Sequence, residues 1–318
     1  MATAHTSFDL KNVMSNGGYV GRFAPTPSGQ MHFGSLVTAL GSFLQAKSQN
    51  GRWLLRIEDI DPQREVAGAS ESILRCLEAH HLFWDHEVIY QSNRSDLYSE
   101  KIQYLTDQGF TYHCQCTRTQ LVNLKFGQTC VCAKKNLNIE NVNNENSAIR
   151  FRHHNIHQAF YDELLGQVNF PKCDIPAQFA IKRKDNLFAY QLAVVVDDIQ
   201  QGITEVARGA DLLDATLFQL ALYQAFDRPA PRFLHFPVVV TEPGKKLSKQ
   251  NHAREINTDD AHANLINALG FLGFLPSKAL QRGSVQNILN WAICEWDLRK
   301  IPAKTECIDN RIGLADSI

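Results

Sequence analysis

Residues 22–35 read RFAPTPSGQMHFGS, and this stretch decides the fold. The apolar sequence of residues 18–24 predicts a buried first strand. Residues 34–47 predict a helix, because their apolar side chains recur at helical spacing. Residues 52–59 then predict a second strand, which completes a β-α-β unit. A parallel pair of strands joined by a helix is the entry to a doubly wound α/β fold.

The turn within this stretch carries the residue types of a phosphate site. Pro25 and Pro27 fix the backbone, and Gly29 and Gly34 permit close approach. His32 stands just ahead of the predicted helix, where an imidazole can donate to a phosphate oxygen beside the helix N-terminal amides. The alternative is an ordinary strand-to-helix turn that contains a histidine and glycines.

A basic stretch, KKLSK at residues 245–249, follows another predicted strand at residues 232–240. Lysine is a flexible point charge, which suits a mobile polyphosphate, and Gly244 lets the loop move. Alone, Lys246 and Lys249 are more typical of a solvated loop. Together with residues 22–35, they predict a cleft for a nucleotide.

Size and composition set outer limits on the interpretation. The chain has 318 residues and a formal net charge of −1, which gives no global sign of a nucleic-acid partner but allows a local patch. No run of about 18 apolar residues predicts a membrane span. Residues 1–17 do not resemble a secretion signal, and we interpret them as a frayed extension. We therefore expect a cytoplasmic protein.

The rest of the chain continues the α/β pattern with one interruption. Further helices are predicted at residues 66–81, 92–108, 210–226, 260–272 and 284–301, and strands at residues 148–152 and 188–196. The predicted domains are an N-terminal extension (1–17), a Rossmann-type core (18–110 and 148–255), a cysteine-rich insert (111–147) and a helical C-terminal region (256–318).

Four of the eight cysteines form the insert's signature. Cys114 and Cys116 are separated from Cys130 and Cys132 by thirteen residues. A large chain without a secretion signal favours reduced thiols, and four thiolates suit a tetrahedral zinc ion. The C-x-C spacing is tighter than the common C-x-x-C pairs, so four reduced cysteines around a hairpin are the alternative.

Two of these stretches resemble the signature motifs of class I aminoacyl-tRNA synthetases. Residues 32–35, HFGS, resemble the HIGH motif, with Ser35 in place of its second histidine, and residues 246–249, KLSK, resemble KMSKS. The flanks are similar to the glutamate branch of that class. These flanks are GRFAPTPSG (21–29), RIEDID (56–61), YQLAVVVDD (190–198) and GITEVARG (202–209). The resemblance implies a Rossmann-type doubly wound parallel sheet with a small zinc-binding insert.

The same resemblance implies a glutamate pocket. It assigns the substrate carboxylates to Arg22, Tyr190 and Arg208, and the α-ammonium to Glu58. The other implied glutamate contacts are Phe23, Ala24, Pro25, Thr26 and Ser28. Arginine suits this task because its planar fork pairs with a carboxylate through two hydrogen bonds. The alternative is that Arg22 and Glu58 pair with each other as a buried bridge between strands. Asp197 and Asp198 are interpreted as helix or ribose contacts.

The resemblance also implies an ATP site and a structural metal. Implied ATP contacts are His32, Gly34, Ser35 and Lys249, implied catalytic residues are His32, Lys246 and Lys249, and Mg²⁺ accompanies ATP. Related proteins bind zinc through a C-x-C pair, a tyrosine and a third cysteine four residues after it. Phe126 precedes Cys130 by four residues here, and Gln128 precedes Cys132. The implied set is therefore Cys114, Cys116, Cys130 and Cys132, with the third ligand left open between the last two.

Only 69 residues follow Lys249, too few for the anticodon-reading module of a glutamyl-tRNA synthetase. The chain thus resembles the truncated glutamyl-Q tRNA(Asp) synthetase family. This implies tRNA-independent activation of L-glutamate by ATP, then transfer to the queuosine base at the wobble position of tRNA(Asp), by a monomer. The alternatives are a shortened glutamyl-tRNA synthetase that charges tRNA(Glu), a non-catalytic tRNA- or partner-binding relative, and a nucleotidylyltransferase.

Overall fold

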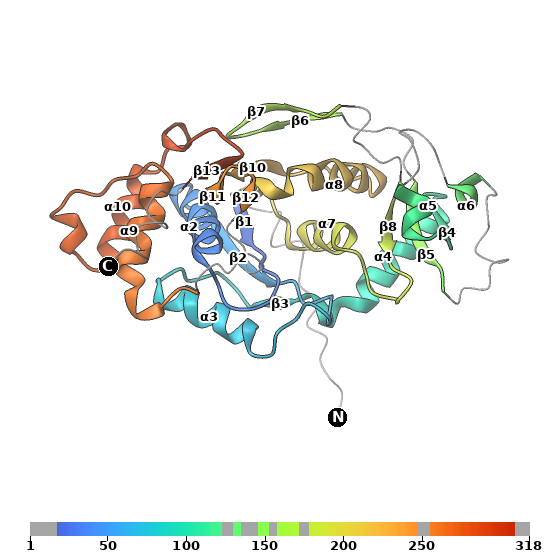
Figure 1. The fold of residues 1–318 in the computed structure, drawn as a ribbon, viewed down its shortest axis with the longest axis horizontal. Coiled ribbons are helices and arrows are strands. Elements are labelled where there is room, and N and C mark those ends of the chain that lie inside the picture. Colours follow the sequence, from blue (N-terminus) through green and yellow to red (C-terminus); the bar gives the residue numbers. More distant parts are fainter. Residues whose placement is uncertain are drawn as a thin grey trace.

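The structure is a computed structural model that describes residues 18–122, 130–134, 146–152, 158–171, 178–246 and 255–308. The molecule is elongated, with C-terminal helices at the left of Figure 1, parallel strands in the middle and a cysteine-bearing module at the right. Among the described helices, none combines the length and apolar composition needed to span a bilayer.

The predicted β-α-β unit is confirmed at the start of the described chain. It consists of β1 (Val20–Phe23), α2 (Phe33–Ser48) and β2 (Arg52–Ile57). β1 and β2 are parallel, with Arg22 opposite Leu54, and β3 (Ile89–Tyr90) extends the sheet in parallel beyond β2. α2 is buried along most of its length, so it packs as a central helix between the sheet and the C-terminal region.

A second group of parallel strands lies beside the first. β9 (Glu205–Gly209) and β10 (Arg232–Phe236) are parallel and are joined by α8 (Leu213–Ala225). β6 (Ala159–Asp162) is parallel to β10, and β7 (Gly166–Asn169) pairs antiparallel with β6. The Thr204 amide donates to the Val20 carbonyl oxygen at 2.9 Å, which places the start of β9 next to β1.

This contact gives the parallel strands the spatial order β3-β2-β1-β9-β10-β6. The connections run outward in opposite directions from β1 and β9. In open α/β sheets, such a reversal opens a crevice at the carboxyl ends of the strands, where ligands bind. The predicted α/β fold with a parallel sheet is therefore confirmed, and the reversal marks where to look for a site.

The strand predicted at residues 188–196 is wrong. The structure has a helix there, α7 (Tyr190–Gln201), which ends at Gly202 in the left-handed conformation with φ 65°. Every side chain from Leu192 to Asp198 is buried, and the apolar run at residues 192–196 is short enough to fit either a buried strand or a buried helix. The β-branched run at residues 194–196 then favoured a strand.

The remaining helices agree with the sequence prediction, while the strand ends do not. The confirmed helices are α3 (Ala69–Ala79), α4 (Ser95–Asp107), α9 (Ala261–Phe271) and α10 (Val285–Glu295). The strand predicted at residues 232–240 divides at Pro237 into β10 and β11 (Val238–Glu242). β11 pairs with β12 (Lys245–Lys246) and with an unpredicted strand, β13 (Glu306–Ile308).

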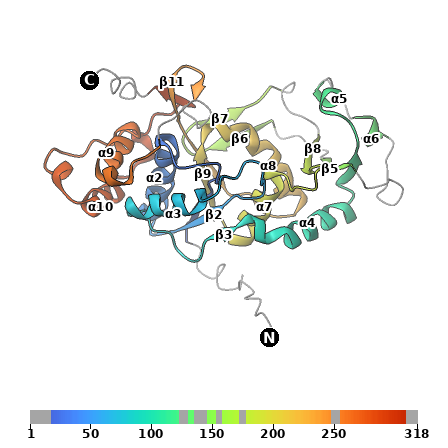
Figure 2. The same ribbon diagram turned by 60° about the horizontal axis from the view of Figure 1, so that its bottom comes forward.

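The cysteine-bearing module is built on a separate antiparallel sheet (Figure 2). Its strands are β4 (Thr111–Cys114), β5 (Ala148–Arg152) and β8 (Gln178–Lys182). Two short helices, α5 (Arg118–Val122) and α6 (Val131–Lys134), accompany it. β8 leads back to α7, so this sheet is joined directly to the core at the helix that carries Tyr190.

Candidate active site

A cavity of about 610 Å³ lies where β1, β2, β9 and β10 end. Its lining includes every predicted glutamate or ATP residue in the described part of the chain. These are Arg22, Phe23, Ala24, Pro25, Thr26, Ser28, His32, Gly34, Ser35, Glu58, Tyr190 and Arg208. The structure thus brings together residues from three distant segments of the sequence. Lys249 lies outside the described residues.

His32 caps the helix that begins at the cavity. Its backbone is extended, and its Nδ1 accepts a hydrogen bond from the Ser35 amide at 3.3 Å. A neutral imidazole in this arrangement carries its proton on Nε2, which is the nitrogen able to donate to a ligand. A Cβ at Gly34 would lie 3.2 Å from the His32 ring, so glycine lets the helix start close to the imidazole.

The chain on both sides of the second basic motif is anchored beside this turn. Lys246 of β12 pairs with Val240, the residue after cavity-lining Val239. Glu255 forms a backbone bridge with His32, and the Ile256 amide donates to the Met31 carbonyl oxygen at 3.0 Å. The segment between these two anchors, residues 247–254, lies outside the described residues, as does the side chain of Lys246.

Arg22 is held by an aspartate on α7, not by Glu58. Its Nε lies 3.2 Å from Asp198 Oδ1, and its Nη2 donates to Asp198 Oδ2 at 3.4 Å. Asp198 Oδ1 also accepts from Arg56 Nη1 at 2.8 Å. Burial would raise the pKa of Asp198, but the two arginines outweigh it and lower that pKa. The aspartate is therefore an ionised bridge between β1 and β2. It lies on α7 and outside the cavity lining, which agrees with the helix-contact alternative of the prediction for Asp198.

Asp197 anchors the same helix to the first turns of α4 and to the residues just before it. It accepts from Gln91 Nε2 at 2.7 Å, Arg94 Nε at 2.7 Å and Tyr98 Oη at 2.8 Å. Its side chain is fully buried and does not line the cavity. Asp197 is thus a structural contact from a helix. Sequence reasoning did not identify Arg56, Gln91 or Tyr98 as its neighbours, because no local pattern connects them.

Glu58 is a buried carboxylate at the cavity wall. It directly follows β2, is 6% exposed, and its Oε1 lies 3.6 Å from Arg56 Nη2. Burial raises the pKa of Glu58 to about 7, although the positive charges of Arg56 and Arg22 act in the opposite direction. The carboxylate is therefore short of compensating charge, which is the state expected of a group that receives a cation.

Arg208 is the second buried arginine of the cavity. It is 4% exposed, and its described acceptors include the uncharged side chains of Gln219, Thr216 and His235. Burial lowers its pKa, which means that its charge is under-compensated. The cavity lining thus combines three guanidinium groups, those of Arg22, Arg64 and Arg208, with the carboxylates of Glu58 and Asp211 and a helix N-terminus. This set fits an anionic amino acid beside a phosphate ester. Sequence reasoning missed the other polar lining residues, Thr38, Arg64 and Asp211, which carry no motif.

The four clustered cysteines converge as predicted. Their sulfur atoms all lie within 4.8 Å of one another, with Cys114 and Cys130 3.8 Å apart and Cys116 and Cys132 3.6 Å apart. Sulfurs at about 2.3 Å from a tetrahedral zinc ion are about 3.8 Å apart. The four thiols therefore have the spacing to hold one metal ion. Phe126 and Gln128 lie outside the described residues.

Comparison with known proteins places these observations in a family. Residues 19–291 match the family described as "tRNA synthetases class I (E and Q), catalytic domain". A relative from Vibrio parahaemolyticus, named glutamyl-Q tRNA(Asp) synthetase, is 46% identical over 288 residues, covering 91% of this chain and 96% of that protein. A relative of the same name from Photobacterium profundum is 46% identical over 290 residues, covering 91% and 92% of the two chains.

The fold also has a solved counterpart. The crystal structure of glutamate-tRNA synthetase from Elizabethkingia anophelis matches with a TM-score of 0.73 at 23% identity, covering 92% of this chain and 68% of that chain. At this identity, the likeness extends to the fold alone. It agrees with the strand order and with the crevice at the reversal of connectivity.

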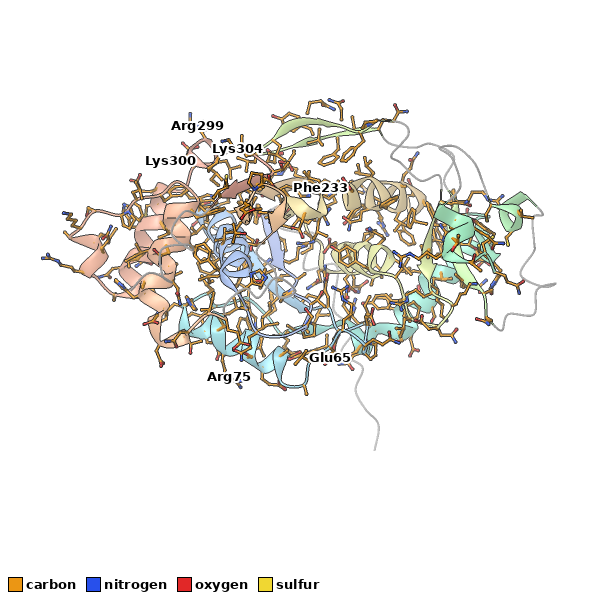
Figure 3. All side chains as sticks on the ribbon, in the orientation of Figure 1. Glu65, Arg75, Phe233, Arg299, Lys300 and Lys304 are labelled. Atoms are coloured by element: carbon orange, nitrogen blue, oxygen red, sulfur yellow. The ribbon has the colours of Figure 1, made fainter. Side chains whose placement is uncertain are left out.

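The bridge at Asp198 yields a prediction about stability. Asp198→Asn removes the charge that compensates buried Arg22 and Arg56, and we expect it to lower the free energy of unfolding by about 3–5 kcal/mol. Urea denaturation followed by circular dichroism measures this loss. The matched control is Asp297→Asn, which breaks a pair with exposed Arg299 at the outer surface of the C-terminal region (Figure 3). This control should unfold as the wild type does; equal midpoints for all three proteins would contradict the structural role of Asp198.

Proposed function

We propose a function from one premise: the chain belongs to the class I tRNA synthetases of the glutamate and glutamine type, in the glutamyl-Q tRNA(Asp) synthetase family. It is a ligase that activates L-glutamate with ATP without needing tRNA. It then transfers the glutamate to the queuosine base at the wobble position of tRNA(Asp). The observation that carries the proposal is the shared lining of one cavity by the HIGH-like turn, Glu58, Tyr190 and Arg208.

Glutamate recognition follows from the charges around the cavity. Arg22, Arg208 and the Tyr190 hydroxyl bind the two carboxylates, and Glu58 binds the α-ammonium. Burial supports this assignment, because hydrogen bonds and ion pairs are stronger where water is excluded. Backbone and side-chain groups at Phe23, Ala24, Pro25, Thr26 and Ser28 complete the pocket.

ATP binds with its phosphates at the N-terminus of α2. His32 donates through Nε2, Gly34 and Ser35 lie at the first turn, and Lys246 and Lys249 supply positive charge from the second motif. The described residues on either side of residues 247–254 pair with Val240 and His32 beside the cavity, and this supports the assignment of the two lysines to ATP. Mg²⁺ accompanies ATP and neutralises phosphate charge when it is bound.

The reaction takes place in two steps. A carboxylate oxygen of glutamate attacks the α-phosphorus of ATP, so that a P–O bond forms to the amino acid and the bond to pyrophosphate breaks. The residues position the reactants and stabilise the charge of the leaving pyrophosphate. A queuosine hydroxyl then attacks the activated carbonyl carbon, its proton is released, and AMP leaves. The ester bond on the modified base is the product.

The acceptor is tested by mapping. With labelled glutamate, ATP and mixed tRNA, we expect the label in the anticodon fragment of tRNA(Asp) after nuclease digestion, and none on tRNA that lacks queuosine. Label at the 3′ end of tRNA(Glu) would instead establish a shortened glutamyl-tRNA synthetase.

Lys249→Ala should keep the circular dichroism spectrum of the wild type but lose at least about 100-fold in ATP–pyrophosphate exchange, because it removes a transition-state charge contact. Unchanged exchange would remove Lys249 from the catalytic set.

The buried carboxylate predicts a pH dependence. Ionised Glu58 binds the substrate ammonium, and its pKa of about 7 means that it becomes protonated as the pH falls through 7. Glutamate itself does not titrate between about pH 6 and 8. We therefore expect the KM for glutamate to rise on acidification, approaching about tenfold per pH unit, at saturating ATP. Glu58→Gln should have a high KM that does not change with pH. A flat wild-type profile over this range would be evidence against Glu58 as the ammonium ligand.

The cysteine cluster holds one structural zinc ion through four thiolates. The sulfur spacing supports this assignment, and closed four-thiol sites are typical of structural zinc. Zinc in this position ties β4 to α6. The chemistry it supplies is cross-linking, since no ligand position is left for substrate.

Metal content tests the four-thiol assignment. Protein purified with zinc should contain one ion per chain by atomic absorption, and Cys132→Ser should lower the affinity by at least about tenfold, because a thiolate ligand is lost. The control is Cys294→Ser, since Cys294 is exposed and lies outside the cluster. Full zinc retention in Cys132→Ser would contradict the assignment, and a metal-free wild type would establish a plain thiol cluster.

A further inference from the structure

The guanidinium of Arg208 is held from behind by protein acceptors. Its Nη1 donates to Gln219 Oε1 at 2.9 Å, and its Nη2 donates to Thr216 Oγ1 at 2.8 Å and to the Leu212 carbonyl oxygen at 3.2 Å. Its Nε donates to His235 Nε2 at 3.0 Å. An arginine has five N–H donors, so four are used in fixing the orientation of the fork. The Tyr190 hydroxyl also contacts the guanidinium from the cavity.

His235 is a fully buried histidine whose tautomer is set by its neighbours. Because arginine stays protonated, the Nε2 that faces Arg208 must be the bare, accepting nitrogen. The proton therefore lies on Nδ1, which donates to Asp162 Oδ2 at 2.7 Å. The stacked ring of Phe233, labelled on β10 in Figure 3, lies beside both His235 and Arg208 and limits their movement.

Asp162 is itself rigidly placed. Its side chain is fully buried, and its Oδ1 accepts from the amides of Leu164 and Leu165 at 3.0 and 2.9 Å. The residue ends β6, opposite Phe233 in β10. Hydrogen bonds therefore run from the β6–β7 turn through Asp162 and His235 to Arg208, across three neighbouring strands, and end at the cavity. No residue of this path before Arg208 is among the residues that line it.

We propose that Asp162 and His235 are positioning residues, which aim the Arg208 guanidinium at a carboxylate of the amino-acid substrate. The inference deepens the proposed function and rests on it. Asp162 fixes the imidazole, the imidazole fixes Nε of Arg208, and the fork is then directed before substrate arrives. Neither residue touches the substrate.

The imidazole of His235 separates the carboxylate of Asp162 from Arg208, and this separation is central to the arrangement. A carboxylate in direct contact would balance the charge of Arg208 and so weaken its attraction for the substrate carboxylate. A neutral imidazole between them accepts the hydrogen bond without supplying a negative charge. Arg208 is therefore oriented by four hydrogen bonds to uncharged acceptors, and its positive charge remains available to the ligand. Arg22 differs, because Asp198 contacts it directly.

Paired substitutions of His235 test the path. An asparagine amide can replace the contact of Nδ1 with Asp162 but does not reach Arg208, whereas a glutamine amide can reach the position of Nε2. In glutamate-dependent ATP–pyrophosphate exchange, we expect His235→Asn to raise the KM for glutamate by about 10- to 100-fold. The KM for ATP should stay within about twofold. His235→Gln should recover a large part of the glutamate affinity.

A second experiment changes the tautomer of His235 without removing its imidazole. Asp162→Asn can place an amide donor against Nδ1, which moves the histidine proton to Nε2 and sets it against the N–H of Arg208. We expect a similar rise in the KM for glutamate. In nitrogen NMR of ¹⁵N-histidine-labelled protein, the His235 signals should change from the Nδ1-protonated to the Nε2-protonated form. The signals are assigned by their loss in His235→Asn.

The controls separate positioning from general damage. His80 is also fully buried, and its Nδ1 lies 2.6 Å from the Cys76 carbonyl oxygen, far from this path in the chain. His80→Asn should therefore leave the KM for glutamate unchanged. A variant that is partly unfolded would have a lower apparent kcat, while its KM values for glutamate and for ATP would not change differently from each other.

Three results would overturn the inference. A glutamate KM within about twofold of the wild type in folded His235→Asn would do so, as would equal losses in His235→Asn and His235→Gln. If Asp162→Asn does not fold, the His235 pair decides the question alone. A wild type with no glutamate-dependent exchange would overturn the proposed function together with this inference, whereas normal wild-type exchange with unaffected variants would overturn only the inference.

Discussion

The carboxylate of Asp198, buried between Arg22 and Arg56, is the interaction on which the site depends. It joins α7 to β1 and β2, which are the first strands of the sheet, although it lies more than 140 residues from both arginines. Burying three charged groups costs solvation free energy. The attraction between the aspartate and the two arginines offsets that cost only while all three groups are present. The same contact fixes Arg22 at the cavity wall. Stability of the core and shape of the site are therefore linked through one side chain.

The cavity uses two different means of holding an arginine. Arg22 receives a carboxylate directly, so its charge is largely balanced within the protein. Arg208 is held by neutral acceptors, and its carboxylate stands one imidazole away. The excess positive potential is consequently greater at Arg208, while Glu58 supplies negative potential nearby. This asymmetry orients a zwitterion that has one more carboxylate than ammonium groups.

The parts of the fold that sequence predicted are those set by local residues. The turn at residues 22–35 contains its own prolines, glycines and helix cap. The four clustered cysteines indicate a metal site by residue type and spacing alone. α7 was misjudged because the short apolar run at residues 192–196 fits a buried strand as well as a buried helix, and its three consecutive valines favour a strand. The path from Asp162 to Arg208 was invisible for another reason. Its members come from β6, β10 and β9, and only tertiary structure brings them together.

The cavity fits the proposed activation of glutamate without RNA. The groups assigned to glutamate all come from this chain, and the described ones are already placed by buried contacts. Nothing in their placement requires a nucleic acid to complete it, because Asp198 fixes Arg22 and His235 fixes Arg208 from within the core. Choice of acceptor is then a property separate from the placement of these glutamate-binding groups. A family can therefore keep the activation chemistry of a synthetase while changing the nucleotide that receives the amino acid.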